Sequence, residues 1–135
     1  MIQEHARAVA DFLAARGLTA YDAEAGRKWD GAIEAATFPY AVVSMSSPVS
    51  TTETLGHARE RAELDTTIGY HGSTPEQARW AADRVATLAG VHLAVTGRQC
   101  VVESAFSSLV RRDDDNPDQV VWSGADGFTV LSYPA

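Results

Sequence analysis

The sequence predicts an α+β fold, in which a mainly antiparallel four-stranded sheet carries two main helices and residues 1–135 form a single domain. Residues 64–71 alternate between apolar and polar side chains, which is the period of a strand with one buried face. Residues 75–89 place small and aliphatic side chains on one stripe, which indicates a helix lying against a sheet. Residues 91–95 return to strand alternation, and a length of 135 residues suits one domain.

The chain begins with an expected amphipathic helix over residues 2–16, which Gly17 ends. Its apolar stripe repeats at helical spacing: Ile2, Ala6, Val9 and Leu13. Residues 18–37 mix apolar anchors with glycines and charges, so we expect a connection with one short helical turn. The first strand is expected over residues 38–45, with Pro39 confining its start to an edge position.

A polar arm and a long strand are expected next. Residues 46–54 are rich in Ser, Thr and Pro without periodicity, so they predict a loop that is long for a compact domain. A loop of this length is more typical of a functional arm or a hairpin tip than of a plain connector. Residues 57–70 predict a second strand that pairs back with the first, and its charged beginning projects beyond the sheet.

The second helix has recognisable signals at both ends. Thr74 can cap it with its side-chain oxygen, Pro75 stands where a missing N–H costs nothing, and Gln77 completes a capping box. Gly90 ends the helix.

Trp80 breaks the pattern of this helix. At about 100° per residue it lies roughly opposite Val85, away from the apolar stripe. Two readings are open. A later segment of the same molecule covers the ring, because Trp is highly buried on average, or a neighbouring subunit covers it, because Trp is over-represented at interfaces.

The C-terminal third predicts strands separated by one acidic turn. Extended chain is expected over residues 100–112, 120–123 and 127–133, and the turn over residues 113–118. Gly124 and Gly127 indicate a bend or bulge. The expected core comprises Val9, Leu13, Val42, Leu64, Ile68, Val85, Leu88, Leu93 and Val130.

Composition limits the classes of function. Lys and Arg number 11 against 18 Asp and Glu, so the net charge is −7, which argues against direct binding to nucleic acid. Cys100 is the one cysteine, so no intramolecular disulfide forms. The N-terminus lacks a signal-peptide pattern and no apolar run approaches the length of a membrane span, so we expect a soluble chain that is not secreted and contacts no membrane.

The acidic turn fails the pattern of a calcium loop. Asp114, Asn116 and Asp118 match its first three oxygen positions, but Gln119 stands where a Gly is needed and Ala125 where a bidentate Glu belongs. We therefore predict no metal site there.

No catalytic pattern is evident. Cys100 has no local signature of a nucleophile, and a lone Cys in a strand is usually a small buried hydrophobe. The four histidines lack metal or triad spacing, and nucleophile-elbow, Walker and Gly-x-Gly-x-x-Gly motifs are absent. We expect no enzyme activity and no cofactor.

The order of features resembles the tail terminator family, also called tail completion or minor tail proteins, of long-tailed bacteriophages. An N-terminal helix leads to a Phe-Pro-Tyr-Ala-Val-Val strand, a polar arm and a long strand before the capped helix. The segments that carry the resemblance are residues 38–43, 70–85, 93–98, 111–114, 120–122 and 128–130.

The resemblance implies a structural protein of the virion. Six copies would form a homo-hexameric ring that terminates the tail tube at its head-proximal end, after assembly in the host cytoplasm. The partners would be the major tail tube protein and the head–tail connector or adaptor, which docks on the ring, while DNA passes the channel without specific binding. Residues that acquire a role at subunit contacts or facing the channel are Trp80, Arg79, Asp83, Pro48, Thr52, Asp113, Asp114, Asp115 and Asp118.

Two alternatives remain. Another head–tail joining or minor tail protein would share this composition and oligomeric habit. A small-molecule-binding or enzymatic α+β domain belongs to a different class, and it would need a pocket with convergent polar groups, which no set of residues in the sequence nominates.

Overall fold

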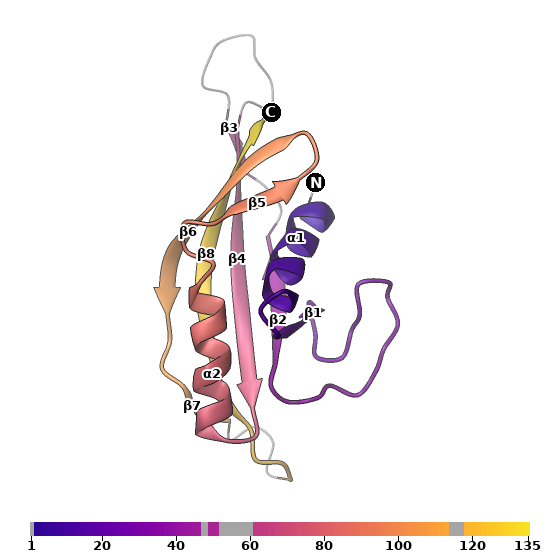
Figure 1. Cartoon of the computed structure of the whole chain (residues 1–135), viewed down its shortest axis with the longest axis vertical. Coiled ribbons are helices and arrows are strands. Elements are labelled where there is room, and N and C mark those ends of the chain that lie inside the picture. The colour runs from indigo at the N-terminus through magenta and orange to yellow at the C-terminus, as the bar shows by residue number, and fades with distance from the viewer. Residues whose placement is uncertain (1, 47–48, 52–60, 114–117) are drawn as a thin grey trace.

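The computed structural model describes residues 2–46, 49–51, 61–113 and 118–135. Two helices and eight strands make up this part of the chain (Figure 1). In chain order they are α1 (Ile2–Ala14), β1 (Thr19–Asp22), β2 (Tyr40–Met45), β3 (Val49–Thr51), β4 (Arg61–Gly72), α2 (Pro75–Ala86), β5 (His92–Val95), β6 (Arg98–Ser107), β7 (Arg111–Arg112) and β8 (Trp122–Pro134).

The predicted four-stranded sheet is wrong. The described residues form one mixed sheet of eight strands, with the order β1-β2-β4-β8-β6-β5, and with β3 paired to β4 and β7 paired to β8. β1 and β2 are parallel, whereas the other pairs are antiparallel. Strands of two to four residues, such as β1, β3 and β7, are too short for a period of two to stand out in the sequence. The parallel pair requires the long connection over residues 23–39, because parallel strands cannot be joined by a tight turn.

Both helices pack on one face of the sheet. α2 contacts the two long central strands, β4 and β8. α1 contacts β1 and β2 near one end of the strand order and β5 at the other (Figure 1). The sheet therefore curls into a half-barrel, and α1 lies across the opening between its two edge strands.

The buried core lies between this face and the helices. Along β4 every second residue is buried, from Ala62 to Gly72, and its partners on β8 share that face. Eight of the nine expected core residues are buried, the exception being Val42. β2 turns Ala41 and Val43 inward instead, so Val42 faces outward and is half-buried. The apolar run over residues 41–43 has no alternation, so the sequence cannot specify which face is buried.

The start of α2 follows the sequence prediction closely. The Thr74 side chain accepts a hydrogen bond from the Gln77 N–H at 3.1 Å, and Pro75 occupies the first turn. The Gln77 side chain reaches one residue further back than a standard capping box, to the Ser73 N–H at 2.8 Å. The helix itself ends at Ala86, and turns continue to Gly90.

Candidate functional site

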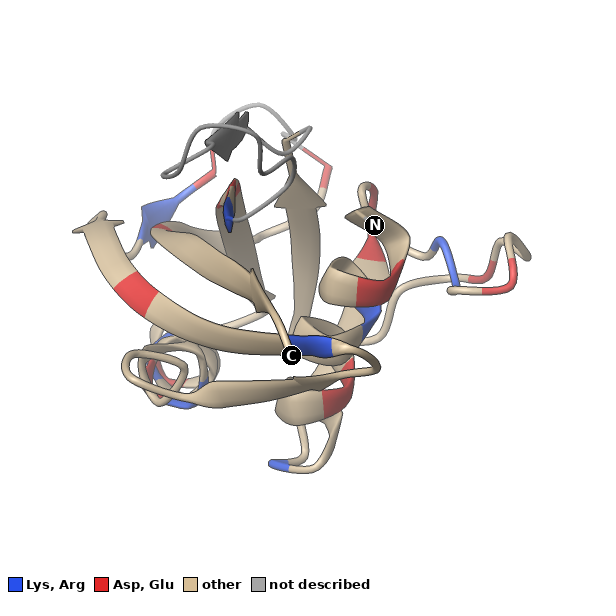
Figure 2. Cartoon of the chain, turned by 90° about the horizontal axis from the view of Figure 1, so that it is seen from above, with Lys and Arg blue, Asp and Glu red and all other residues tan. Residues whose placement is uncertain are grey.

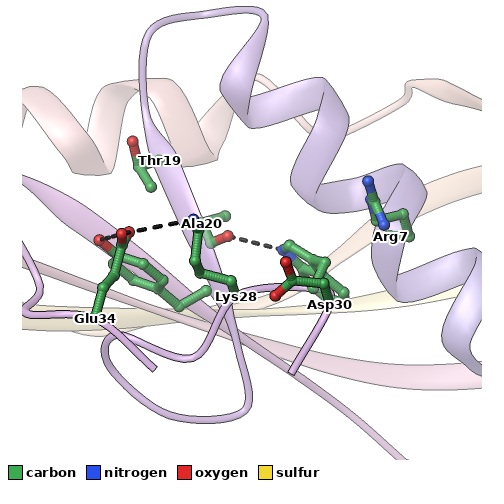
Figure 3. A pocket seen from close by; sticks show the side chains of 8 residues that line it. Arg7, Thr19, Ala20, Lys28, Asp30 and Glu34 are labelled. Atoms are coloured by element: carbon green, nitrogen blue, oxygen red, sulfur yellow. Dashed lines mark hydrogen bonds and ion pairs between the residues drawn. The ribbon is translucent and has the colours of Figure 1, made fainter. Parts of the chain in front are cut away.

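The edge of the sheet at β1 is closed by the chain itself. The connection over residues 23–39 folds back along the strand, and the Trp29 indole N–H donates to the Ala20 carbonyl at 2.9 Å (Figure 3). The Asp22 N–H donates to the Arg27 carbonyl, also at 2.9 Å. These bonds occupy backbone groups that an edge strand otherwise presents to another chain.

A hollow of about 300 Å³ lies between α1, β1 and this connection (Figure 3). Three of its polar side chains bind one another. The Tyr21 hydroxyl donates to Glu34 at 3.3 Å, and Lys28 lies 3.8 Å from the same carboxylate. Burial, and then the charge of Glu34, raises the pKa of Tyr21. The hollow therefore supports the closed edge and shows no set of polar groups converging on a ligand.

The opposite edge, at β5, is open. The Val95–Arg98 pair flanks a two-residue turn, so Val95 and Leu93 direct their backbone groups to β6, while Ala94 and His92 direct theirs outward. Within the described part of the chain β5 pairs with β6 alone.

A groove runs between this open edge and α1. It consists of three adjoining hollows of about 310, 270 and 310 Å³. Residues of α1 form one wall and β5 with its turn forms the other. We call it the α1–β5 groove, and its lining includes Glu4, Arg7, Ala8, Asp11, Phe12, Leu93, Ala94 and Thr96.

A second open stretch lies further along the same side of the sheet. A bulge between Ser104 and Phe106 shifts the register of β6, beyond the point where β5 covers it. The Phe106 ring then lies over Gly127 but stays 55% exposed, and Leu109 is 77% exposed. Residues 106–112, which we call the edge segment, are exposed except for Val110.

Trp80 is half-buried within its own subunit. Its ring packs against the core beside Gly17 at the end of α1, and the Arg84 guanidinium lies 4.6 Å from the ring centre. The chain thus covers part of the side chain, but Gly17 precedes α2 in the sequence, whereas the first of the two readings expects a later segment there. Arg79 and Asp83 on the same helix are exposed.

The remaining predicted interface residues fall in two groups. Asp113 is half-buried, and its N–H donates to the Val121 carbonyl at 2.7 Å, while Asp118 is exposed. The other four, Pro48, Thr52, Asp114 and Asp115, lie outside the described residues.

An aromatic row lies on the helix-free face. The Tyr40 ring stacks on His71 with centroids 4.9 Å apart and on Phe38 at 5.3 Å, and it meets Tyr21 edge-to-face at 5.6 Å. Burial lowers the pKa of His71, while the charge of Asp113 partly opposes this shift.

Two buried polar clusters join distant parts of the chain. The Ser132 hydroxyl lies 2.8 Å from His5 Nε2, accepts from Arg98 Nε at 2.8 Å and lies 3.5 Å from Cys100 Sγ. The sequence did not anticipate a histidine near Cys100. His5, Ser132 and Cys100 are at most 2% exposed, so this cluster ties α1 to β8 and offers no access to a substrate.

The second cluster is centred on Asp126. Its carboxylate accepts from Ser107 at 2.7 Å and from the Tyr70 hydroxyl at 3.2 Å. Burial, followed by the charge of Asp126, raises the pKa of Tyr70 to about 12.

Neither a metal-binding cluster nor a membrane-spanning helix occurs among the residues that the structure describes. In that part of the chain, no group of three His, Cys, Asp or Glu side chains is placed to hold a metal ion. Likewise, none of its helices is both long and apolar enough to span a bilayer.

Comparison with known proteins finds one informative likeness. No family model matches the chain, and no curated protein matches it. Among solved structures, a chain of the virion of a native gene transfer agent particle is similar, with a TM-score of 0.57 and 18% identity. The match covers 98% of this chain and 91% of that one. At this identity it shows a shared fold over nearly the whole length.

Sequence reasoning missed the most open surfaces. The α1–β5 groove depends on which strand ends the sheet, and no local pattern specifies that. The exposed Leu109 carried a usable signal, because it follows two serines in a segment with weak alternation.

Proposed function

We propose that this protein is a non-catalytic structural component of a phage-like particle, and that it forms a ring which terminates the tail tube and offers a docking surface to the head connector. The observation that carries the proposal is the likeness to a chain of the gene transfer agent virion, which extends over 98% of this chain. The order of sequence features that resembles tail terminators supports the same role.

The two edges of the sheet suit a subunit of a ring. A closed ring of identical subunits uses heterologous contacts, in which one surface binds a different surface of the next copy. This chain presents an open edge at β5 and a self-covered edge at β1. A tube that grows by adding rings stops where the last ring has one face that matches the tube and one that does not.

The charge suits a channel through which DNA passes. Nucleic-acid affinity arises largely from basic side chains that release counterions from phosphates. A net charge of −7 on each subunit disfavours such binding. A ring of these subunits would let DNA slide through without holding it.

Another head–tail joining or minor tail protein is the rival within the same class. The likeness to a virion chain favours both roles equally, because it does not specify where in the particle the protein lies. Cryo-electron microscopy of the particle distinguishes them: density for this chain between tube and connector supports a terminator, and density elsewhere supports the rival.

Deletion of the gene tests the terminator role. We expect overlong tails of variable length, unattached to filled heads, in electron micrographs. The matched control is the deletion strain complemented with the intact gene, which should restore uniform, joined tails. Tails of normal length joined to heads in the deletion strain would refute the proposal.

A further inference from the structure

We propose that neighbouring subunits are joined by a strand-in-groove contact, in which the edge segment of one copy, residues 106–112, lies in the α1–β5 groove of a second copy. This inference rests on the proposed ring, and it names the two surfaces that make the subunit contact. The occupant of the groove is therefore another copy of this chain.

The groove has the properties of a site for an extended segment. Its floor is the outer edge of β5, where the backbone groups of His92 and Ala94 point away from β6. An added strand binds such an edge through main-chain hydrogen bonds, and hollows beside it select side chains. The hollow at one end is lined by Ala8, Phe12 and Leu93, so it suits an aliphatic side chain.

The edge segment has the complementary properties. It is extended, since Arg111 and Arg112 pair with β8 on one side, while the described residues place no strand on its other side. Leu109 projects from it with 77% of its surface exposed. An exposed edge with large apolar side chains is unusual in a monomer, because it invites pairing with another chain.

Length agrees with one direction of docking. The α1 wall from Phe12 to Glu4 is about 12 Å long at 1.5 Å per residue. Leu109 and Arg112 are separated by about 10 Å in extended chain. With Leu109 beside Phe12, the two arginines lie along the part of the groove where α1 carries Glu4, Arg7 and Asp11, and Arg7 pairs with Asp11 at 3.6 Å. Acidic segments are seen on the helix beside the N label in Figure 2.

The closed edge explains why the contact uses these two surfaces. Trp29 and Arg27 already bind the outer backbone groups of β1, so a strand from another copy cannot add there. Because the edge segment and the groove are different surfaces of one chain, the contact is heterologous, as a ring requires.

Engineered cysteines test the contact in assembled particles. The native Cys100 is only 2% exposed, so Leu109→Cys and Ala94→Cys provide the reactive thiols. We expect a short thiol crosslinker to join the two single variants when they are co-expressed and assembled together. We expect the double variant to give a ladder of multimers.

The controls separate this contact from others. Ile33→Cys replaces a residue that is 65% exposed on the opposite connection, and it should not crosslink to Ala94→Cys. Absence of a crosslink between Leu109→Cys and Ala94→Cys would overturn the contact. Crosslinking of Leu109→Cys with itself at equal yield would also overturn it, since that indicates a symmetric dimer.

A substitution pair supplies an independent measurement. Leu109→Asp should raise the protein concentration needed for ring formation at least tenfold, and it should leave the circular dichroism of the subunit unchanged. Ile33→Asp should change neither quantity. Equal assembly of both variants would refute the contact. If rings form equally well with Leu109→Asp, the proposed contact is wrong but the proposed function stands. If the protein is absent from particles, the proposed function is wrong.

Discussion

The two edge strands of the sheet, β1 and β5, differ in what binds their outer backbone groups. At β1 a connection of 17 residues, 23–39, returns to bind the strand, and a tryptophan side chain donates to its backbone. At β5 the neighbouring helix α1 contacts the strand, and a groove runs between the two. Natural proteins usually protect both edges against unwanted pairing. In the proposed ring, the open edge would be the one that binds the next subunit, while the covered edge would be protected against unwanted pairing.

Proline substitutions on β5 give the sharpest test of the open edge. Leu93→Pro removes a hydrogen bond to Cys100 on β6 and should lower the free energy of unfolding by about 3 kcal/mol or more. Ala94→Pro removes only an outward N–H and should cost less than about 1 kcal/mol. Urea denaturation of both variants measures the difference. Equal losses would show that the outer side of β5 is already paired.

The closed edge is tested at Trp29. Trp29→Ala should lower the free energy of unfolding by roughly 2 kcal/mol, less than the loss for a fully buried ring, because Trp29 is half-buried. The variant should also self-associate, since the outer edge of β1 becomes exposed. Trp29→Phe keeps most of the packing and should lose only about 1 kcal/mol with the hydrogen bond. Light scattering and denaturation report the two effects, and a monomeric, fully stable Trp29→Ala would contradict the role of the ring.

Trp80 offers a competing location for the subunit contact. Because its ring is partly covered by its own subunit, Trp80→Ser should cost about 1 kcal/mol, against about 3 kcal/mol for the fully buried Val85→Ser. We expect Trp80→Ser to assemble normally if the α1–β5 groove is the contact. Loss of ring formation with an intact subunit would move the contact to the outer face of α2.

The smallest effect concerns His71, on the half of the sheet next to the closed edge. Because burial lowers its pKa in the folded chain, the unfolded chain takes up a proton more readily. The stability contributed by the neutral ring is thus present above about pH 6.5 and is lost as the pH falls through the folded pKa. His71→Phe keeps the stack on Tyr40 and should flatten this part of the pH profile in thermal denaturation. An unchanged profile would show that His71 does not contribute.

The sequence predicts local structure well and edges poorly. The capped start of α2 and the alternation of Leu64 to Tyr70 are local patterns, and both appear in the structure. The short strand β1 becomes a strand only because β2 lies beside it, and this pairing joins Thr19 to Tyr40 across the connection. The face that β2 buries could not be read either, since Ala41, Val42 and Val43 are all apolar. The α1–β5 groove and the open edge at β5 follow from such long-range pairings, so the sequence alone does not reveal them.

The bulge in β6 constrains which mutations the chain can accept, and in which order. Phe106 crosses directly over Gly127, and any Cβ at Gly127 would overlap its ring. Replacement of Gly127 therefore requires the Phe106 ring to move away or to be exchanged for a smaller side chain. Deletion of the single codon for Ala105 would remove the register shift and leave Phe106 opposite Gly127, its present partner. In the undeleted chain an unshifted register would instead place Phe106 opposite Asp126, whose partner on β4, Ile68, faces the core. The extra residue thus keeps this aromatic ring on the outer face of the sheet.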